Sequence, residues 1–286
     1  MPVLKQKGCN ARICKAFDNA LYLPLTSRSR YVLFSDCHRG SGNTNDNFLK
    51  NEFIYLAALN YYYQKRFIYL ELGDGDELWE NRSMEEIKEA HVHCFEMLQL
   101  FQMKKRFYAL YGNHDMKKKE NPEGFPFYES FILKDMHGQK DIYITHGHQP
   151  ELLNSTFWKL ARFMVRYLWK PLEYLGIPDP TSAAQNNTRK AYSEKRLTKW
   201  AISQNHLLIT GHTHHPMIGT PASPYCNTGS CVHPASITCI EIENRCLTLV
   251  KWSMQARMDM SLYAKREVLG KTVCVDVYAE NKHCGK

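Results

Sequence analysis

Short apolar runs alternate with longer helical patterns through the first two thirds of the chain. The apolar runs predict strands at residues 31–35, 67–72, 106–111, 142–145 and 207–210. Between them, the spacing of apolar residues predicts helices at residues 47–64 and 84–104. Strands that alternate with helices are joined by right-handed crossovers, so we expect an α/β fold with a covered, largely parallel sheet.

The pattern changes beyond residue 216. Residues 237–242 and 246–252 are separated by a short polar segment, Glu243 to Arg245, which predicts an antiparallel hairpin. We therefore expect two packed sheets flanked by helices, within one domain over residues 1–252. Residues 253–286 show no clear periodicity and are assigned to a C-terminal extension.

Residues 151–205 read as an all-helical insertion between the fourth and fifth strands. Within it, Lys159, Arg162, Arg166 and Lys170 recur at spacings of three, four and four, which places them on one helix face. Aromatic and aliphatic residues surround them, and the insertion holds nine Lys/Arg against four Asp/Glu. Two interpretations stay open: a helix packed on the sheet with a solvated basic edge, or a lid. A lid would bind an anionic, amphiphilic substrate or contact an acidic membrane surface.

Composition narrows the class of protein. The 286 residues are 44% apolar and 23% charged, which is typical of a globular chain and argues against a disordered or fibrous one. The sequence has no apolar run of membrane-spanning length and no recognisable signal peptide, so we expect a soluble, cytoplasmic protein. Ten scattered cysteines without a CxxC pair predict reduced, mostly buried thiols. The net charge, 37 − 29 = +8, suits an anionic partner.

Residues that can bind metal follow all five predicted strands. The five segments are Asp36-Cys37-His38, Gly73-Asp74-Gly75-Asp76-Glu77, Gly112-Asn113-His114-Asp115, His146-Gly147-His148 and Gly211-His212-Thr213-His214. Ligands bind beyond the carboxyl ends of strands in open α/β sheets, so all five segments are expected at one edge. Each segment alone arises easily by chance. Their order and their common place after a strand predict one metal site.

The residue types indicate which metals the site would take. Carboxylates and imidazoles without thiolate suit borderline-hard divalent ions such as Mn, Fe or Zn. Two such ions ~3.5–4 Å apart can hold both the attacking and the leaving oxygen of a phosphoryl displacement. A carboxylate is the natural bridge between them, and a neutral Asn oxygen limits the negative charge around them.

These five segments resemble, in order and spacing, the signature motifs of the calcineurin-like metallophosphoesterase superfamily, over roughly residues 30–252. The resemblance implies a four-layer α/β/β/α sandwich with a dinuclear metal centre, with Mn as the expected metal and Fe or Zn as alternatives. It assigns the first metal to Asp36, His38, Asp74 and His214. It assigns the second metal to Asp74, Asn113, His146 and His212, with Asp74 as the bridge.

The same resemblance implies a mechanism. A metal-activated hydroxide would attack phosphorus, and His114, held by Asp115, would protonate the leaving oxygen or stabilise the charged phosphoryl group. Arg39 has two open interpretations, a bidentate contact to a phosphate oxygen or a surface arginine in a Gly-rich loop. His148 would line the mouth of the second metal site and contact substrate, or hydrogen-bond a metal ligand.

Within the superfamily, the spacing from Asp74 to Glu77 and the helical insertion look most like the UDP-2,3-diacylglucosamine hydrolases. Three positions depart from that branch. The branch usually has an arginine where this chain has His114 and an apolar residue where it has Arg39, and it often has an aspartate where this chain has His148. The expected function is therefore hydrolysis of a phosphodiester or pyrophosphate bond in a small-molecule substrate that is lipid- or nucleotide-linked.

Three alternatives stay open. A DNA nuclease or phosphodiesterase of the same superfamily fits the net charge, but the excess charge concentrates in the apolar insertion rather than in a long groove. A phosphomonoesterase would use the same metal site. A non-catalytic scaffold should show gaps among the metal ligands, and the sequence has a ligand at every expected position.

Overall fold

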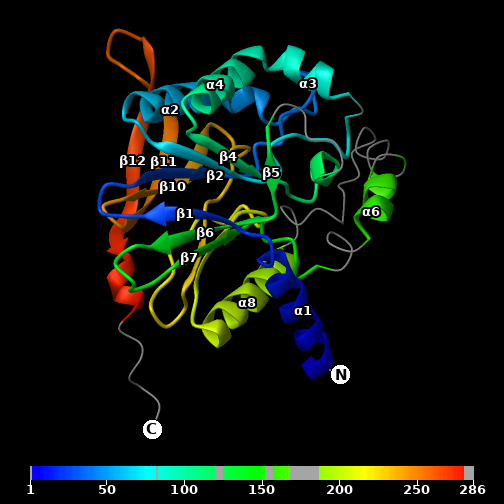
Figure 1. The fold of residues 1–286 in the computed structure, drawn as a ribbon. Coiled ribbons are helices and arrows are strands. Elements are labelled where there is room, and N and C mark those ends of the chain that lie inside the picture. The colour runs from blue at the N-terminus through cyan, green and yellow to red at the C-terminus, as the bar shows by residue number, and fades with distance from the viewer. Residues whose placement is uncertain are drawn as a thin grey trace.

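Two β-sheets pack face to face between two layers of helices in the computed structural model of the chain (Figure 1). The structure describes residues 2–81, 83–119, 125–151, 157–165, 167 and 187–279. Helices α2 (Glu52–Gln64) and α4 (Val92–Met103) cover one sheet, and α1 (Pro2–Ala16) and α8 (Asn187–Gln204) cover the other (Figure 1). The expected α/β/β/α arrangement is confirmed.

The first sheet has seven strands in the order β12-β11-β10-β2-β3-β4-β5. Their bounds are β2 (Arg30–Phe34), β3 (Ile68–Leu72), β4 (Phe107–Leu110), β5 (Phe127–Tyr128), β10 (Ser236–Glu243), β11 (Cys246–Ala256) and β12 (Leu262–Cys274). Strands β2 to β5 pair in parallel, whereas β10, β11 and β12 pair antiparallel. The sheet is therefore mixed, with the expected parallel half beside the expected hairpin.

The second sheet has five strands in the order β1-β6-β7-β8-β9. Their bounds are β1 (Leu21–Leu25), β6 (Ser130–Asp135), β7 (Ile142–Thr145), β8 (Leu207–Thr210) and β9 (Tyr225–Asn227). Strands β7, β8 and β9 are parallel, so the carboxyl ends of β7 and β8 share an edge. This edge carries the two histidine segments that follow those strands.

Three apolar clusters separate the four layers. One lies between the seven-stranded sheet and helices α2 and α4 and includes Phe34, Tyr55 and Phe101. The second fills the space between the two sheets with aliphatic side chains such as Leu33 and Ile209. The third packs α1 and α8 on the five-stranded sheet around Trp200. Burial on both faces explains why the strands that carry the functional segments read as continuous apolar runs.

Several elements differ from the sequence-based expectations. The helix expected at residues 84–104 is two helices, α3 (Met84–Ala90) and α4, which meet at His91. A short 3₁₀ turn (Leu49–Asn51) precedes α2, and two more lie at Met116–Lys119 and Val275–Tyr278. The proposed boundary at residue 252 falls within β11, and β12 pairs with β11 along the same sheet.

The structure describes only parts of the expected insertion. Within it the structure describes helix α6 (Trp158–Met164) with residues 157, 165 and 167, and helix α8, which forms the last part of the insertion. Lys159 and Arg162 lie over the ring of Trp158. Arg166 and Lys170 lie outside the described residues, as do 152–156 and 171–186, so the expected lid stays a prediction.

Cysteine chemistry differs from expectation at one place. Cys246 and Cys274 stand opposite each other on β11 and β12 and form a disulfide. The expectation of reduced thiols is wrong for this pair, because cross-strand pairing brings together two residues that are 28 apart in the sequence. The other described cysteines are free, and all of these except Cys14 are buried. No helix in the described ranges is long and apolar enough to cross a bilayer.

Candidate metal centre

The five segments that the sequence marks as candidates for metal binding converge at the carboxyl ends of strands β2, β3, β4, β7 and β8. Backbone hydrogen bonds join the segments to one another: the amide of Asp36 donates to the carbonyl of Gly73 at 3.1 Å. Likewise, the amide of Gly211 donates to the carbonyl of His146 at 2.9 Å. Each of these bonds joins two segments of the same sheet. The amide of His212, which donates to Oδ2 of Asp36 at 2.9 Å, joins the segments of the two sheets into one site, as their common place after strands predicts.

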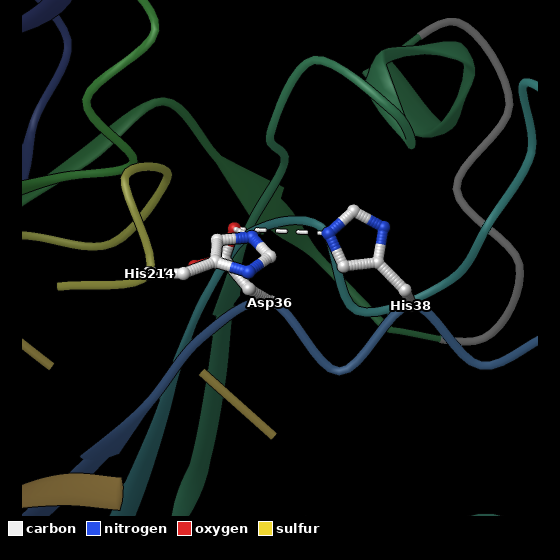
Figure 2. A group of neighbouring side chains, drawn as sticks. All are labelled: Asp36, His38 and His214. Atoms are coloured by element: carbon white, nitrogen blue, oxygen red, sulfur yellow. Dashed lines mark ion pairs between the residues drawn. The ribbon is translucent and has the colours of Figure 1, made fainter. Parts of the chain in front are cut away.

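The first cluster contains Asp36, His38 and His214. Figure 2 shows the two imidazoles turned toward the Asp36 carboxylate, with Nε2 of His38 3.8 Å and Nε2 of His214 3.1 Å from Oδ1. The other carboxylate oxygen, Oδ2, is held by the amide of His212 at 2.9 Å and by the hydroxyl of Ser35. Oδ1 is buried and makes no hydrogen bond of normal geometry.

The second cluster contains Asp74, His146 and His212, whose nitrogen and oxygen atoms lie within 4.8 Å of one another. Nε2 of His146 lies 3.2 Å from Oδ2 of Asp74 and 3.2 Å from Oδ1 of Asn113. The same Asp74 oxygen is 3.9 Å from Nε2 of His38. Asp74 therefore faces both clusters, which is the position of a bridging carboxylate.

These atoms fit divalent metal ions. Nδ1–H of His146 donates to the carbonyl of Leu72 at 2.8 Å, so Nε2 is the nitrogen that faces Oδ2 of Asp74 and Oδ1 of Asn113. A proton on Nε2 stabilises this arrangement without a metal, and a metal ion would take the place of that proton. Together with the buried Oδ1 of Asp36, this pattern fits a cation in each cluster.

Several of the same residues have a strained backbone. Asp36, His38, Asp74, His212 and His214 all have φ between 49° and 67°, the left-handed region that residues with a side chain seldom adopt. Such residues cost of order 1 kcal/mol each and persist where surrounding structure enforces them, commonly at functional sites. Gly112 provides the close approach: a Cβ there would collide with the carboxylate of Asp74.

Electrostatics of the clusters follow from burial and opposite charge. Burial alone would raise the pKa of Asp74, but the neighbouring imidazoles, His146 first, hold it well below its usual value. Burial alone would lower the pKa of His146, but the Asp74 carboxylate raises it to about 9. Asp36 likewise keeps a low pKa despite burial because His214 lies beside it. The clusters therefore favour ionised carboxylates, the form that binds metal.

His114 lies beside the first cluster, and its side chain is 24% exposed, more than those of the metal-facing histidines. Its Nδ1–H donates to Oε1 of Glu77 at 2.8 Å, and its ring stacks on Trp79 with centroids 4.3 Å apart. Oε2 of Glu77 also accepts from Nδ1 of His38 at 2.8 Å. Glu77 therefore orients both rings.

The expectation that Asp115 holds His114 is wrong. The Asp115 carboxylate accepts from the backbone amides of Gly112 at 2.6 Å and Gly75 at 3.1 Å, and from Nζ of Lys118 at 3.2 Å. Asp115 therefore joins the second and third segments. Its buried side chain points toward these amides rather than toward His114. The spacing from Asp74 to Glu77 was the available signal for the true partner; nothing in the sequence pointed to Trp79.

Arg39 does not reach the expected phosphate position. Its side chain is 1% exposed, and its guanidinium donates to both oxygens of Glu71 at 2.9 Å and to Oδ1 of Asp76 at 2.6 Å. These carboxylates occupy the donors that a substrate would need. The interpretation of Arg39 as substrate-binding is therefore corrected to a buried ion-pair role, and the surface alternative is equally wrong.

His148 lies beside the second cluster, with its ring centroid 5.5 Å from that of His146 and 6.4 Å from that of His212. The side chain is buried, and Nδ1 has no hydrogen-bond partner. Its expected contact with substrate stays a prediction.

Comparison with known proteins bears on this site. A family model described as calcineurin-like phosphoesterase matches residues 29–216, which include all five segments. No curated protein matched the sequence significantly.

Matches among solved structures were also found. Vacuolar protein sorting 29 from Cryptosporidium parvum is 16% identical, over 85% of this chain and 98% of that one, with a TM-score of 0.41. Vps29 from Chaetomium thermophilum is 10% identical, over 87% and 99% of the two chains, with a TM-score of 0.41. A cold-active protein tyrosine phosphatase is 14% identical, over 92% and 82%, with a TM-score of 0.40.

Proposed function

Since the chain belongs to the calcineurin-like phosphoesterase family, we propose that it hydrolyses a phosphodiester or pyrophosphate bond at the two clusters joined by Asp74. Family and clusters together support a metal-dependent phosphohydrolase. The observation that carries the proposal is the position of Asp74, whose Oδ2 lies 3.2 Å from His146 and 3.9 Å from His38.

The residues divide the work of such a reaction. Asp36, His38 and His214 would hold one divalent ion, and Asn113, His146 and His212 the other, with Asp74 shared. When bound, a pair of ions supplies an activated water and neutralises charge on the phosphoryl group. The low pKa values of the buried Asp36 and Asp74 keep both carboxylates ionised for this purpose.

His114 is the proposed proton donor to the leaving oxygen. Its Nδ1–H is bound to Glu77, so Nε2 is the atom that exchanges a proton with substrate. Burial alone would lower the pKa of His114, but the Glu77 carboxylate raises it above its usual value, which favours the protonated ring. The stacked Trp79 fixes the plane of that ring.

Support for a lipid-linked substrate comes from helix α6 and its flank. Phe157, Leu160 and Phe163 are 53%, 53% and 60% exposed, and Lys159 and Arg162 lie on the same short helix. Exposed apolar side chains beside cations suit an amphiphilic anion. The resemblance to UDP-2,3-diacylglucosamine hydrolases, which is based on the spacing from Asp74 to Glu77 and on the helical insertion, supports the same substrate class.

Hydrolysis of bis-p-nitrophenyl phosphate compared with p-nitrophenyl phosphate tests the proposed function. We expect turnover of the diester that requires added Mn, disappears with chelator and exceeds turnover of the monoester. Release of phosphate from the monoester alone would contradict the proposed cleavage of diesters or pyrophosphates but would agree with the proposed metal site. Absence of turnover with either ester, and with a lipid pyrophosphate under the same conditions, would contradict the proposal that the protein is an enzyme.

A further inference from the structure

Two histidines of the metal clusters have their second ring nitrogen bound to a fixed acceptor. Nδ1–H of His38 donates to Glu77 and Nδ1–H of His146 donates to the carbonyl of Leu72, both at 2.8 Å. Such partners fix which nitrogen carries the proton, orient the ring and make it a better ligand. A third histidine, His212, has an equivalent partner that the sequence did not point to.

That partner is Glu151. Its Oε1 lies 3.1 Å from Nε2 of His212, and the two side chains are 14% and 3% exposed, so solvent screens the pair only weakly. Glu151 is itself held in place: its amide donates to the carbonyl of His148 at 3.0 Å. The buried hydroxyl of Ser193, on α8, donates to the same Oε1 at 2.7 Å.

We propose that Glu151 is the positioning residue of His212 and connects the second metal site to helix α8. With the proton on Nε2 and directed at Glu151, the lone pair of His212 lies on Nδ1, which is then the nitrogen available to the cation. The inference rests on the proposed function only in taking the cluster of Asp74, His146 and His212 as a metal site.

Helix α8 also contacts the loop after β8 directly. Oε1 of Glu194 accepts from the hydroxyl of Thr213 at 2.8 Å and lies 3.1 Å from Nδ1 of His215. Thr213 lies between the two metal-facing histidines of the fifth segment, so consecutive residues of α8 contact the surroundings of both. Binding of the second metal should therefore stabilise α8, and an intact α8 contact should strengthen metal binding by the same factor.

The test is calorimetric titration of Mn into the metal-free full-length protein and its variants. Glu151→Ala should weaken the second Mn by about 10- to 100-fold, the range seen when such outer partners are removed, and leave the first unchanged. Ser193→Ala should weaken it by about fivefold, as expected for one net hydrogen bond. The matched control is Glu96→Ala, which removes a carboxylate 3.1 Å from the exposed His93 and should change neither site.

The conservative variant separates positioning from direct metal binding. Glu151→Gln keeps an oxygen that accepts from Nε2–H, so it should recover most of the affinity lost in Glu151→Ala. Equal losses in the two variants would mean that the carboxylate itself binds the metal, and unchanged affinity in both would mean that the contact has no effect; either result overturns the inference. Failure of the wild type to bind a second Mn would instead contradict the proposed function.

Thermal unfolding of each variant without metal checks that it is folded. If Glu151→Ala is not, Ser193→Ala and Glu151→Gln carry the test, because both keep the side-chain volume nearly unchanged. Hydrogen exchange gives an independent readout: Mn should protect residues 187–204 in the wild type and much less in Ser193→Ala. Equal protection in both proteins would contradict the connection to α8.

Discussion

Glu77 binds two histidines with different expected tasks, His38 as a metal ligand and His114 as a proton donor. One carboxylate therefore aligns both. Burial opposes its ionisation, but His114 and His38 hold the pKa of Glu77 well below its usual value. At neutral pH Glu77 is charged, and this charge favours the protonated form of His114.

The role of His114 can be separated from metal binding by substitution. His114→Ala removes the proposed proton donor but none of the atoms in the two clusters. We expect two Mn ions still bound per chain and turnover of a diester reduced by about 10²- to 10⁴-fold, the usual contribution of a general acid. Turnover and Mn content measured on the same sample check this, and full activity would rule out the assigned role.

Arg39 is expected to affect stability. Arg39→Ala leaves Glu71 and Asp76 as buried carboxylates without their guanidinium, and breaking such a pair costs about 3–5 kcal/mol of unfolding free energy. Arg30→Ala is the matched control, because its bond to Glu243 joins side chains that are 46% and 40% exposed, and such a surface pair contributes less than about 1 kcal/mol. Urea unfolding compares the two. A raised KM with unchanged stability in Arg39→Ala would instead support contact with substrate.

At the scale of elements, the loop from His38 to α2 is held by a buried carboxylate and a buried histidine. Asp46 accepts from the amides of Gly40 at 3.1 Å and Gly42 at 3.0 Å and lies 2.8 Å from Nε2 of His91. Nδ1 of the same ring lies 3.2 Å from Glu52 at the start of α2. His91 also lies between α3 and α4. At the break in the expected helix, its ring therefore contacts both Asp46 of this loop and Glu52 of α2.

His91 should make stability depend on pH. Burial alone would lower the pKa of His91, but Asp46 and then Glu52 raise it above its usual 6.5. A raised folded-state pKa contributes stability that is fully present below the unfolded-state pKa and is lost as pH rises through the folded-state value. Relative to wild type, His91→Gln should therefore lose most stability near pH 6 and progressively less at higher pH.

Urea unfolding at pH 6, 7, 8 and 9 measures this dependence. The matched control is His93→Gln, whose exposed ring pairs only with Glu96 and should show a small difference at every pH. A deficit in His91→Gln that stays constant across the range would mean that the histidine contributes by packing rather than by charge.

At the scale of the whole molecule, the sequence predicted the parts of the fold that rest on local pattern. Strands β7 and β8 lie where the apolar runs placed them, because strands buried on both faces are continuous in hydrophobicity. Strand β12 was missed because exposed and charged residues interrupt it, and its assignment depends on pairing with β11. Likewise β1 pairs with β6, more than a hundred residues away, and neither was expected.

The site likewise has residues that local pattern predicts and partners that only long-range contacts determine. The residues of the two clusters follow strands and could be predicted, whereas their hydrogen-bond partners depend on contacts between distant segments, as between His212 and Glu151. The disulfide between Cys246 and Cys274 is of that second kind. The cytoplasmic location stays a prediction.

Anomalous diffraction from crystals grown with Mn tests the two-metal account most directly. We expect two Mn peaks per chain, one among Asp36, His38 and His214 and one among Asp74, His146 and His212. Because Asp74 faces both clusters, Asp74→Ala should lose both peaks. A single peak, peaks away from these residues, or two peaks that persist in Asp74→Ala would contradict the account.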